Sequence, residues 1–305
     1  MNKKAITVLS VLIIIIFIGY IIFDTARPAT SKPDAKSTVV PEKSDAWKIT
    51  TEFGVKEGSL KAVAVSAAGK VYLGGDSFVS GYNSDLKVTW SLKTDSPVKA
   101  LSNSGDSIFA ATINQILVIS QTGKVLNEWG PFEDSCLITS VTSNRKYIAF
   151  ADAGNRVVYI LDKGGEVKRM IGQNSKQFVI PSPFFDVALD QENNVFIANT
   201  GEHRIEKYSI DGVKISQFGE AGLAPEYFCG CCAPPHFALI PQGFVTAEKG
   251  INRIKILDKH GGLIELVNSK NSFIKSEPLD LASADGMTIY GAYAPDSKLY
   301  VFTRK

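Results

Sequence analysis

Residues 196–219 read FIANTGEHRIEKYSIDGVKISQFG and contain the pattern that decides the fold. A short apolar strand is followed by a polar turn, a second strand, the Asp211-Gly212 turn and a third strand that ends in Phe218-Gly219. Short alternating segments bounded by Gly, Asn and Asp turns are typical of antiparallel β-strands. From Trp47 onward no long stretch has the helical period of about 3.6 residues. The sequence therefore predicts an all-β fold.

The strand that follows a polar turn recurs along the chain. Its copies are spaced by about 36 to 49 residues, which is the length of one four-stranded blade of a β-propeller. The six copies are GKVYLGG from Gly69, GDSIFAA from Gly105, RKYIAFA from Arg145, NNVFIAN from Asn193, QGFVTAE from Gln242 and DGMTIYG from Asp285. This repeat predicts a six-bladed β-propeller over residues 47–305.

The last copy is incomplete, because its second strand lies at the end of the sequence. Residues 47–54, WKITTEFG, have the shape of a blade-closing strand but precede the first blade. A ring without an open sheet edge forms if this strand completes the last blade. An open β-sandwich with coincidental spacing is the alternative.

Residues 196–219 resemble the NHL repeat in their Gly-x-His-Arg-Ile segment, the Asp-Gly turn and the closing Phe-Gly. FADAGNRVVYILDKGGEVKRMIG from Phe150 and TAEKGINRIKILDKHGGL from Thr246 are similar, more diverged copies. The resemblance covers about residues 47–305 and implies a six-bladed propeller like those of bacterial, membrane-anchored NHL proteins. NHL propellers bind proteins or RNA, act as sensors and occasionally serve as lyases or hydrolases. The resemblance therefore implies a fold and no single function.

The N-terminal region predicts a membrane anchor. Residues 5–23 form an uncharged apolar run of about 19 residues, or roughly 28 Å of helix, which matches the hydrocarbon core of a bilayer. Two lysines in residues 1–4 precede it and few positive charges follow, so residues 1–4 are expected in the cytoplasm. Residues 24–46 contain three prolines and predict a flexible linker. We expect a single-pass protein with an extracytoplasmic propeller, periplasmic or at the cell surface. A cleaved signal peptide and a buried core helix are the alternatives.

The loops that lead into the innermost strands, here called mouth loops, meet at one mouth of a propeller channel. The residues at the start of the six innermost strands are Ala62, Lys99, Thr139, Asp186, His236 and Asp280. We predict a ligand-binding site at this mouth made by Asp186, His236, Asp280, Phe185 and Lys99. Asp186, His236 and Asp280 come from consecutive blades and carry the ligand atoms that divalent cations take. A divalent metal ion is therefore the candidate cofactor, and no other cofactor is indicated.

A structural interpretation of the same residues stays open. Asp186 and Asp280 would then hydrogen-bond loop backbone, and His236 would pack against the loop before it. Phe184 and Phe185 lie beside Asp186, where aromatic rings can contact a ligand. Packing between blades explains at least one of the two rings.

The cysteines lie in two mouth loops, with Cys136 before the third blade and Cys229, Cys231 and Cys232 before the fifth. The topology places them outside the cytoplasm, where thiols can oxidise. Structural disulfides could brace the long loop, including a strained bond between the adjacent Cys231 and Cys232. A thiolate metal site with Cys136 and His236 is the second interpretation. Redox-active or free thiols are the third, since Cys229 and Cys232 have C-x-x-C spacing.

Composition and motifs narrow the function. The chain has 33 Lys and Arg against 31 Asp and Glu, a net charge of +2, which disfavours a nucleic-acid partner. It has no nucleophile elbow, P-loop or dinucleotide fingerprint. We expect a binding module for a protein, peptide or small ligand rather than an enzyme. The alternative is a metal-dependent enzyme or redox protein that uses Asp186, His236, Asp280 and the loop of residues 229–232.

Overall fold

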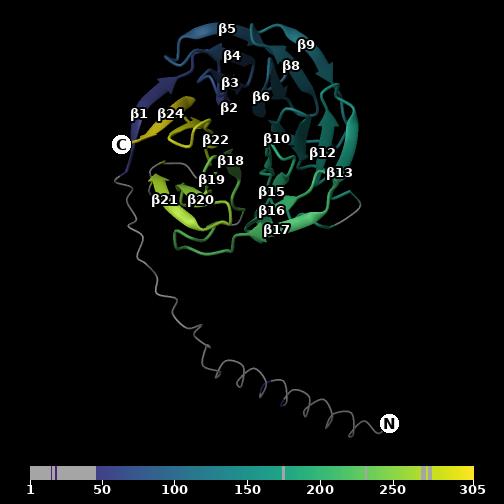
Figure 1. Ribbon diagram of the computed structural model, residues 1–305, viewed down its shortest axis with the longest axis vertical. Helices are drawn as coiled ribbons and strands as arrows, with labels where there is room; N and C mark the ends of the chain where they lie inside the picture. The colour runs from purple at the N-terminus through teal and green to yellow at the C-terminus, as the bar shows by residue number, and fades with distance from the viewer. Residues whose placement is uncertain are drawn as a thin grey trace. The chain divides into compact units, whose positions relative to one another are not determined.

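Six four-stranded antiparallel sheets correspond to the predicted blades. They are set around a central axis in the computed structural model (Figure 1). The structure describes residues 46–173, 176–230, 232–268, 273 and 277–305, together with Ile15 and Ile18. The predicted all-β propeller is therefore confirmed for the part of the chain after the linker.

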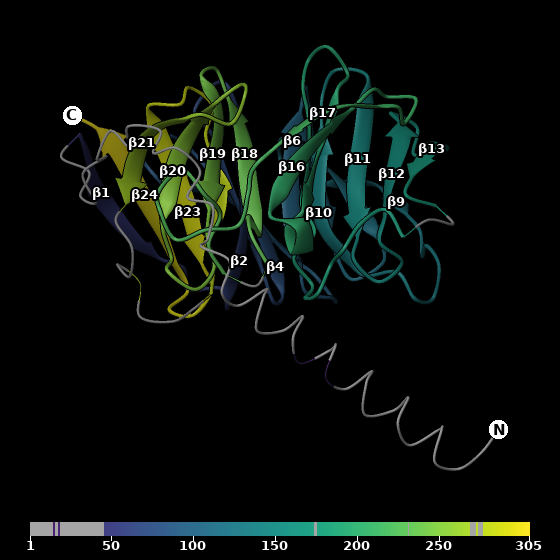
Figure 2. The same cartoon turned by 90° about the horizontal axis from the view of Figure 1, so that it is seen from below.

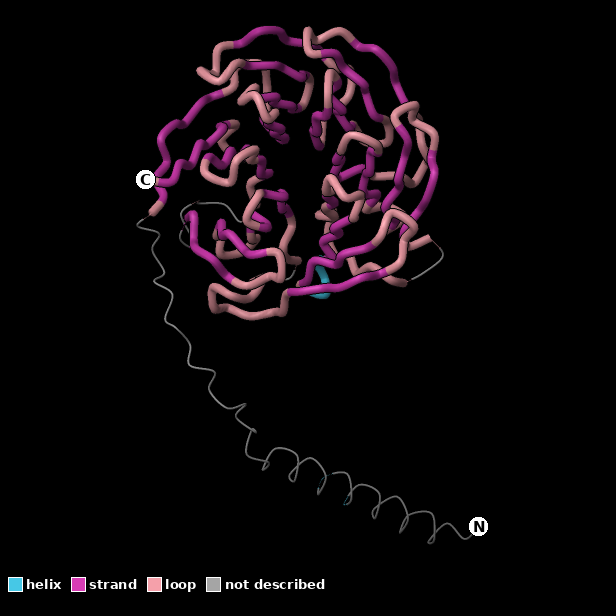
Figure 3. Tube along the Cα trace, viewed as in Figure 1, coloured by secondary structure: helices cyan, strands magenta, loops and turns pink. Residues whose placement is uncertain are grey.

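Within each of the first five blades the strands follow chain order from the innermost to the outermost. The first three blades are β2 (Leu60–Val65), β3 (Val71–Gly75), β4 (Phe78–Tyr82) and β5 (Val88–Lys93); β6 (Ala100–Ser104), β7 (Ser107–Ala111), β8 (Ile116–Ser120) and β9 (Val125–Trp129); and β10 (Ile138–Ser143), β11 (Tyr147–Asp152), β12 (Val157–Asp162) and β13 (Val167–Ile171). The last three are β14 (Val187–Leu189), β15 (Val195–Asn199), β16 (Arg204–Tyr208) and β17 (Lys214–Phe218); β18 (His236–Ile240), β19 (Gly243–Ala247), β20 (Ile254–Asp258) and β21 (Leu263–Asn268); and β22 (Asp280–Ala282), β23 (Thr288–Tyr293), β24 (Lys298–Arg304) and β1 (Trp47–Gly54). A 3-10 helix, η1 (Thr200–Glu202), follows β15 and is coloured cyan in Figure 3.

The ring closes through its first and last strands, as the sequence predicts. β1 pairs antiparallel with β24 from Trp47 opposite Arg304 to Gly54 opposite Lys298, with one bulge near Ile49. In Figure 1 the purple β1 lies beside the yellow β24. The open sandwich is therefore wrong, because the sixth sheet takes its outer strand from the start of the domain.

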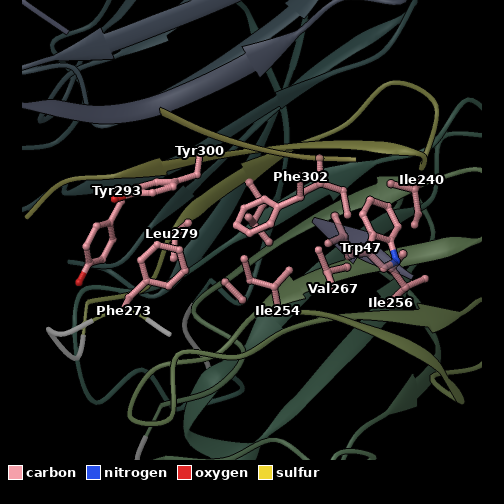
Figure 4. Close-up of a cluster of buried hydrophobic side chains, with 14 residues drawn as sticks. Trp47, Ile240, Ile254, Ile256, Val267, Phe273, Leu279, Tyr293, Tyr300 and Phe302 are labelled. Atoms are coloured by element: carbon pink, nitrogen blue, oxygen red, sulfur yellow. The ribbon is translucent and has the colours of Figure 1, made fainter. Parts of the chain in front are cut away.

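The hydrophobic core lies between adjacent blades. The second strands β3, β15 and β19 are buried along their whole length, whereas most residues of the outer strands β9 and β17 are exposed. Figure 2 shows the blades from the side of the ring. One cluster joins Phe109 of the second blade to Phe150 and Tyr159 of the third. Another surrounds Trp47 where the fifth and sixth blades meet (Figure 4).

The glycine turns and closing aromatic residues of the repeat contact each other across blade boundaries. Trp129 ends β9 and lies against Gly165, in the turn between β12 and β13 of the next blade. Gly165 has a φ of +90°, and a Cβ there would lie 2.5 Å from the Trp129 ring. Phe218 meets Gly261 of the fifth blade in the same way. Glycine is needed at these turns for both conformation and space.

The described propeller falls within one compact unit, Pro41–Lys305. Apart from Ile15 and Ile18, the predicted anchor over residues 5–23 lies outside the described residues, as does most of the linker. Among the described residues no helix is long and apolar enough to cross a membrane.

Candidate functional site

A cavity of about 320 Å³ lies where the innermost strands meet and is lined by residues of all six blades. Its charged lining residues are Asp186, His236 and Asp280. Asp186 immediately precedes β14, and His236 and Asp280 are the first residues of β18 and β22. The starts of equivalent strands lie at the same end of the ring, so the structure brings together the three side chains that the sequence alignment placed at the mouth.

His236 stands between the two carboxylates. Its Nδ1 is 3.7 Å from Oδ2 of Asp186 and 3.7 Å from Oδ1 of Asp280. Both separations exceed a direct hydrogen bond, so the attraction is electrostatic. The side chains of Asp186, His236 and Asp280 are 9%, 18% and 21% exposed, and a small ligand in the cavity can therefore reach them.

Both aspartates also join neighbouring blades. Asp186 Oδ2 accepts a 2.8 Å hydrogen bond from the backbone N–H of Phe237, and Oδ1 accepts from the Ser140 hydroxyl. Asp280 Oδ2 accepts a 2.8 Å bond from the N–H of Val63 in the first blade. The aspartates therefore accept backbone hydrogen bonds, as the structural interpretation has it, but from strands of neighbouring blades rather than from loops. The site and the ring share these carboxylates.

Asp186, His236 and Asp280 are here called the triad. Their electrostatic interactions favour a proton on His236. Burial by itself lowers the pKa of His236, but the carboxylates of Asp186, Asp280 and Glu277 outweigh it and the pKa is raised. Burial raises the pKa of Asp280 to about 6, although His236 and the N–H of Val63 oppose the shift. The charge of Asp280 is therefore only partly compensated by its neighbours.

The pKa of His236 is expected to lie above 6.5 in the folded chain, and Asp280→Asn is expected to lower it, because the substitution removes one of the carboxylates that raise it. A raised folded pKa means that protonation stabilises the fold below pH 6.5, and this stabilisation is lost as the pH rises through the folded value. An NMR titration of the imidazole resonances measures the pKa, since the chain has three histidines that single substitutions can assign. Asp106→Asn, in the exposed turn after β6, is the charge-matched control. An unchanged or higher pKa in Asp280→Asn would contradict this account.

The triad does not match a metal site. Among the residues that the structure describes, no three or more His, Cys, Asp and Glu side chains form a group that could hold a metal ion. The physical reason is the donor set: Asp186 already accepts from N–H and O–H groups through both oxygens, and one nitrogen of His236 faces both carboxylates. The predicted divalent cation at Asp186, His236 and Asp280 is therefore not supported by this geometry.

Two predicted mouth residues lie elsewhere. Phe185 is 1% exposed and packs against Phe178 in the core between the third and fourth blades. Lys99 is not among the residues that line the cavity, and its pKa is lowered by burial and by the nearby charge of Lys61. The aromatic ring at the triad is instead Phe184, edge-on to His236 with 5.8 Å between ring centroids. Of the two aromatic residues that the sequence places beside Asp186, Phe185 therefore packs between blades and Phe184 lies at His236.

No disulfide joins the three described cysteines, Cys136, Cys229 and Cys232. The disulfides expected from the sequence are therefore not formed among these three, and the expected bond between Cys231 and Cys232 lies outside the described residues. Cys136 lies against Asp152, and burial together with this carboxylate raises its pKa. Cys231 lies outside the described residues. The thiolate needed for metal binding or redox chemistry is disfavoured at Cys136.

Cys136 is expected to resist alkylation in the folded chain. Its side chain is buried and its raised pKa leaves almost no thiolate at pH 8. Iodoacetamide labelling followed by peptide mass spectrometry should find Cys136 modified at least 100-fold more slowly in buffer than in urea. Labelling of Cys136 within minutes in the native chain would show that its loop opens readily.

The mouth loop of the fifth blade is held by a buried ionic network that the sequence did not reveal. Glu248 binds Lys255 Nζ at 2.6 Å and Arg253 Nη2 at 2.8 Å. Lys255 Nζ also donates to the carbonyl of Tyr227 at 2.6 Å, and all three charged side chains are at most 4% exposed. Burial lowers the pKa of Lys255 to about 8 despite the attraction of Glu248.

His203, from the NHL-like segment, holds the same loop from the fourth blade. It has a left-handed φ of 53°, and its Nε2 lies 2.6 Å from the carbonyl oxygen of Gly230, to which it donates. This histidine fixes a loop and is separate from the triad.

Comparison with known proteins agrees with this architecture. No protein-family model matches the chain, and no curated protein matches it. The solved β-propeller domain of Cps50 (Swd1) from Myceliophteria thermophila is similar, with a TM-score of 0.59 over 85% of this chain and 100% of that chain. The fold is a β-propeller. At 10% identity the likeness shows the fold alone, and the NHL assignment is not confirmed.

Proposed function

We propose that this propeller is a binding module that takes a protein, a peptide or a small ligand at its channel mouth. The observation that carries the proposal is the convergence of Asp186, His236 and Asp280 from three blades on one cavity of about 320 Å³. That volume falls within the usual range of ligand pockets, and a few polar groups in a rigid frame are typical of binding sites. Propellers generally serve as scaffolds for interactions, which supports the same conclusion.

We further propose that the module is tethered to a membrane with the propeller outside the cytoplasm and belongs to the NHL type. The support is the apolar run of residues 5–23 with its preceding lysines, and the Gly-x-His-Arg-Ile motif. Alkaline extraction of membranes should leave the full chain in the pellet with an intact N-terminus. A mature N-terminus at or beyond Arg27 would show that the apolar run is a cleaved signal peptide.

Selection of displayed random dodecapeptides on the full chain tests the binding function. His236→Trp fills the mouth with a larger ring, and His260→Trp makes the same change at an exposed turn residue. Peptides enriched on the wild type should lose affinity at least tenfold for His236→Trp and keep it for His260→Trp. Equal binding to both variants, or no enrichment, would refute a binding site at the mouth.

A further inference from the structure

The net charge of the residues that line the channel mouth indicates which chemical class of ligand the proposed binding site takes. The residues that line the cavity include two carboxylates and one imidazole, and none of them is Lys or Arg. The remaining lining residues are apolar side chains such as Leu101 and Phe237, hydroxyls such as Thr139, and amides such as Asn103 and Gln191. The lining is therefore negative when His236 is neutral, and it still carries one net negative charge when His236 and both carboxylates are ionised.

Asp280 keeps acceptor capacity toward the cavity, whereas both oxygens of Asp186 already accept hydrogen bonds. The Asp280 carboxylate accepts from the N–H groups of Val63 and Leu281, and the cationic group nearest to its Oδ1 is the imidazole of His236, 3.7 Å away. A hydrogen-bonded cation at Oδ1 would satisfy a charge that burial destabilises. The raised pKa of Asp280, about 6, reflects the same incomplete compensation.

An aromatic ring beside the triad, that of Phe184, already binds the ammonium group of a lysine in this chain. Lys249 Nζ lies 4.6 Å above the centre of the Phe184 ring, and that ring is edge-on to His236. An aromatic face next to carboxylates is the usual surrounding of a bound ammonium or guanidinium group. A second cation can enter through the cavity, where the lining carries no basic residue to repel it other than His236.

From these contacts we infer that the channel mouth binds a basic side chain, the guanidinium of arginine or the ammonium of lysine, presented by a peptide or protein partner. The inference rests on the proposed function and names its ligand class. The basic group approaches Oδ1 of Asp280 from the cavity, beside the imidazole of His236. Arginine has the advantage of several N–H donors in one plane, which can donate to Asp280 and to polar groups of the lining at the same time.

Ligand binding and protonation of His236 then compete. The groups that act on His236 are Asp186, Asp280 and Glu277, with Phe184 against its ring and Lys249 on the outer side of Phe184. A ligand cation at Asp280 repels the proton on His236, so affinity rises as the pH increases from 5.5 to 8. Higher ionic strength weakens the binding.

Capped pentapeptides of the form Gly-Gly-X-Gly-Gly, with X as Arg, Lys, Gln or Glu, test the inference on the full chain. Binding is followed through the imidazole NMR signals of His236, with His203 and His260 as internal references. The Arg and Lys peptides should shift the His236 signals and lower its pKa, and the Gln and Glu peptides should not. Affinity for the Arg peptide should fall at least tenfold in Asp280→Asn and stay within twofold in Asp106→Asn.

The possible outcomes separate the inference from the proposed function. If the Gln or Glu peptides shift His236 as strongly as the Arg peptide, the ligand class is wrong and binding at the mouth stands. If no peptide shifts His236, the inference is refuted, and the dodecapeptide selection decides separately whether the mouth binds another ligand. A rise in the affinity of the wild type for the Arg peptide from pH 5.5 to 8 supports the inference without any variant, so a folding defect in Asp280→Asn cannot hide the result.

Discussion

Replacing Trp47 by alanine is expected to lower the free energy of unfolding by about 3–5 kcal/mol. Trp47 is 4% exposed and packs into the cluster of the fifth and sixth blades, with Ile256 and Phe302 among its members (Figure 4). Its indole N–H has no hydrogen-bond partner among the described residues, so the loss is one of packing. The substitution removes the packing contact that holds β1 against the fifth and sixth blades, where the ring closes.

Urea unfolding of the full chain, followed by far-ultraviolet circular dichroism, measures this effect. Ile49→Ala is the matched control, because Ile49 is on the same strand and 41% exposed. It should cost less than about 1 kcal/mol. Equal effects of the two substitutions would show that β1 is not held by its buried tryptophan.

Glu248→Gln is expected to lower the free energy of unfolding by about 3–5 kcal/mol at pH 7. The change removes the carboxylate that binds both Arg253 and Lys255, and it leaves two buried cations without their directly bound counter-charge. Glu265→Gln in the same blade is the control, since Glu265 pairs with Arg304 near the surface and should cost less than about 1 kcal/mol.

The pH dependence identifies the mechanism of this loss. The folded pKa of Lys255, about 8, lies below its ordinary value of 10.5, so the unfolded chain binds its proton more tightly. Stability contributed by Lys255 therefore increases as the pH rises from 8 toward 10.5. Without Glu248 the folded pKa falls further, and the loss in Glu248→Gln should be smaller at pH 9 than at pH 7. A loss independent of pH would mean that lost packing, and not an uncompensated charge, causes the destabilisation.

The fold could be predicted because each blade repeats the same local rules. The glycine turns and the closing residues Trp129 and Phe218 are visible in the sequence, and they contact each other in the same way at successive blade boundaries. The displaced segment WKITTEFG also predicts the closure, since a ring requires every sheet edge to be paired. The alignment of innermost strands predicts that Asp186, His236 and Asp280 meet.

The details of the site depend on contacts that no repeat specifies. Phe185 turns into the core because Phe178, from the loop before it, offers a packing surface. In the sequence, Lys255 is an ordinary polar residue of a predicted strand. In the structure, residues 225–227 cover it, and its ammonium group donates to the carbonyls of Pro225 and Tyr227. Cysteine spacing likewise says nothing of whether two sulfur atoms come within bonding distance.

The pairing of β1 with β24 has a consequence for the order of folding during synthesis. Thr50 and Val301 are hydrogen-bonded although they are 251 positions apart, so β1 is synthesised long before the strand with which it pairs. During that interval the backbone edge of β1 has no partner from its own sheet, while the five blades between β1 and the sixth blade can already assemble. The sixth sheet is therefore completed only after β24 has been synthesised.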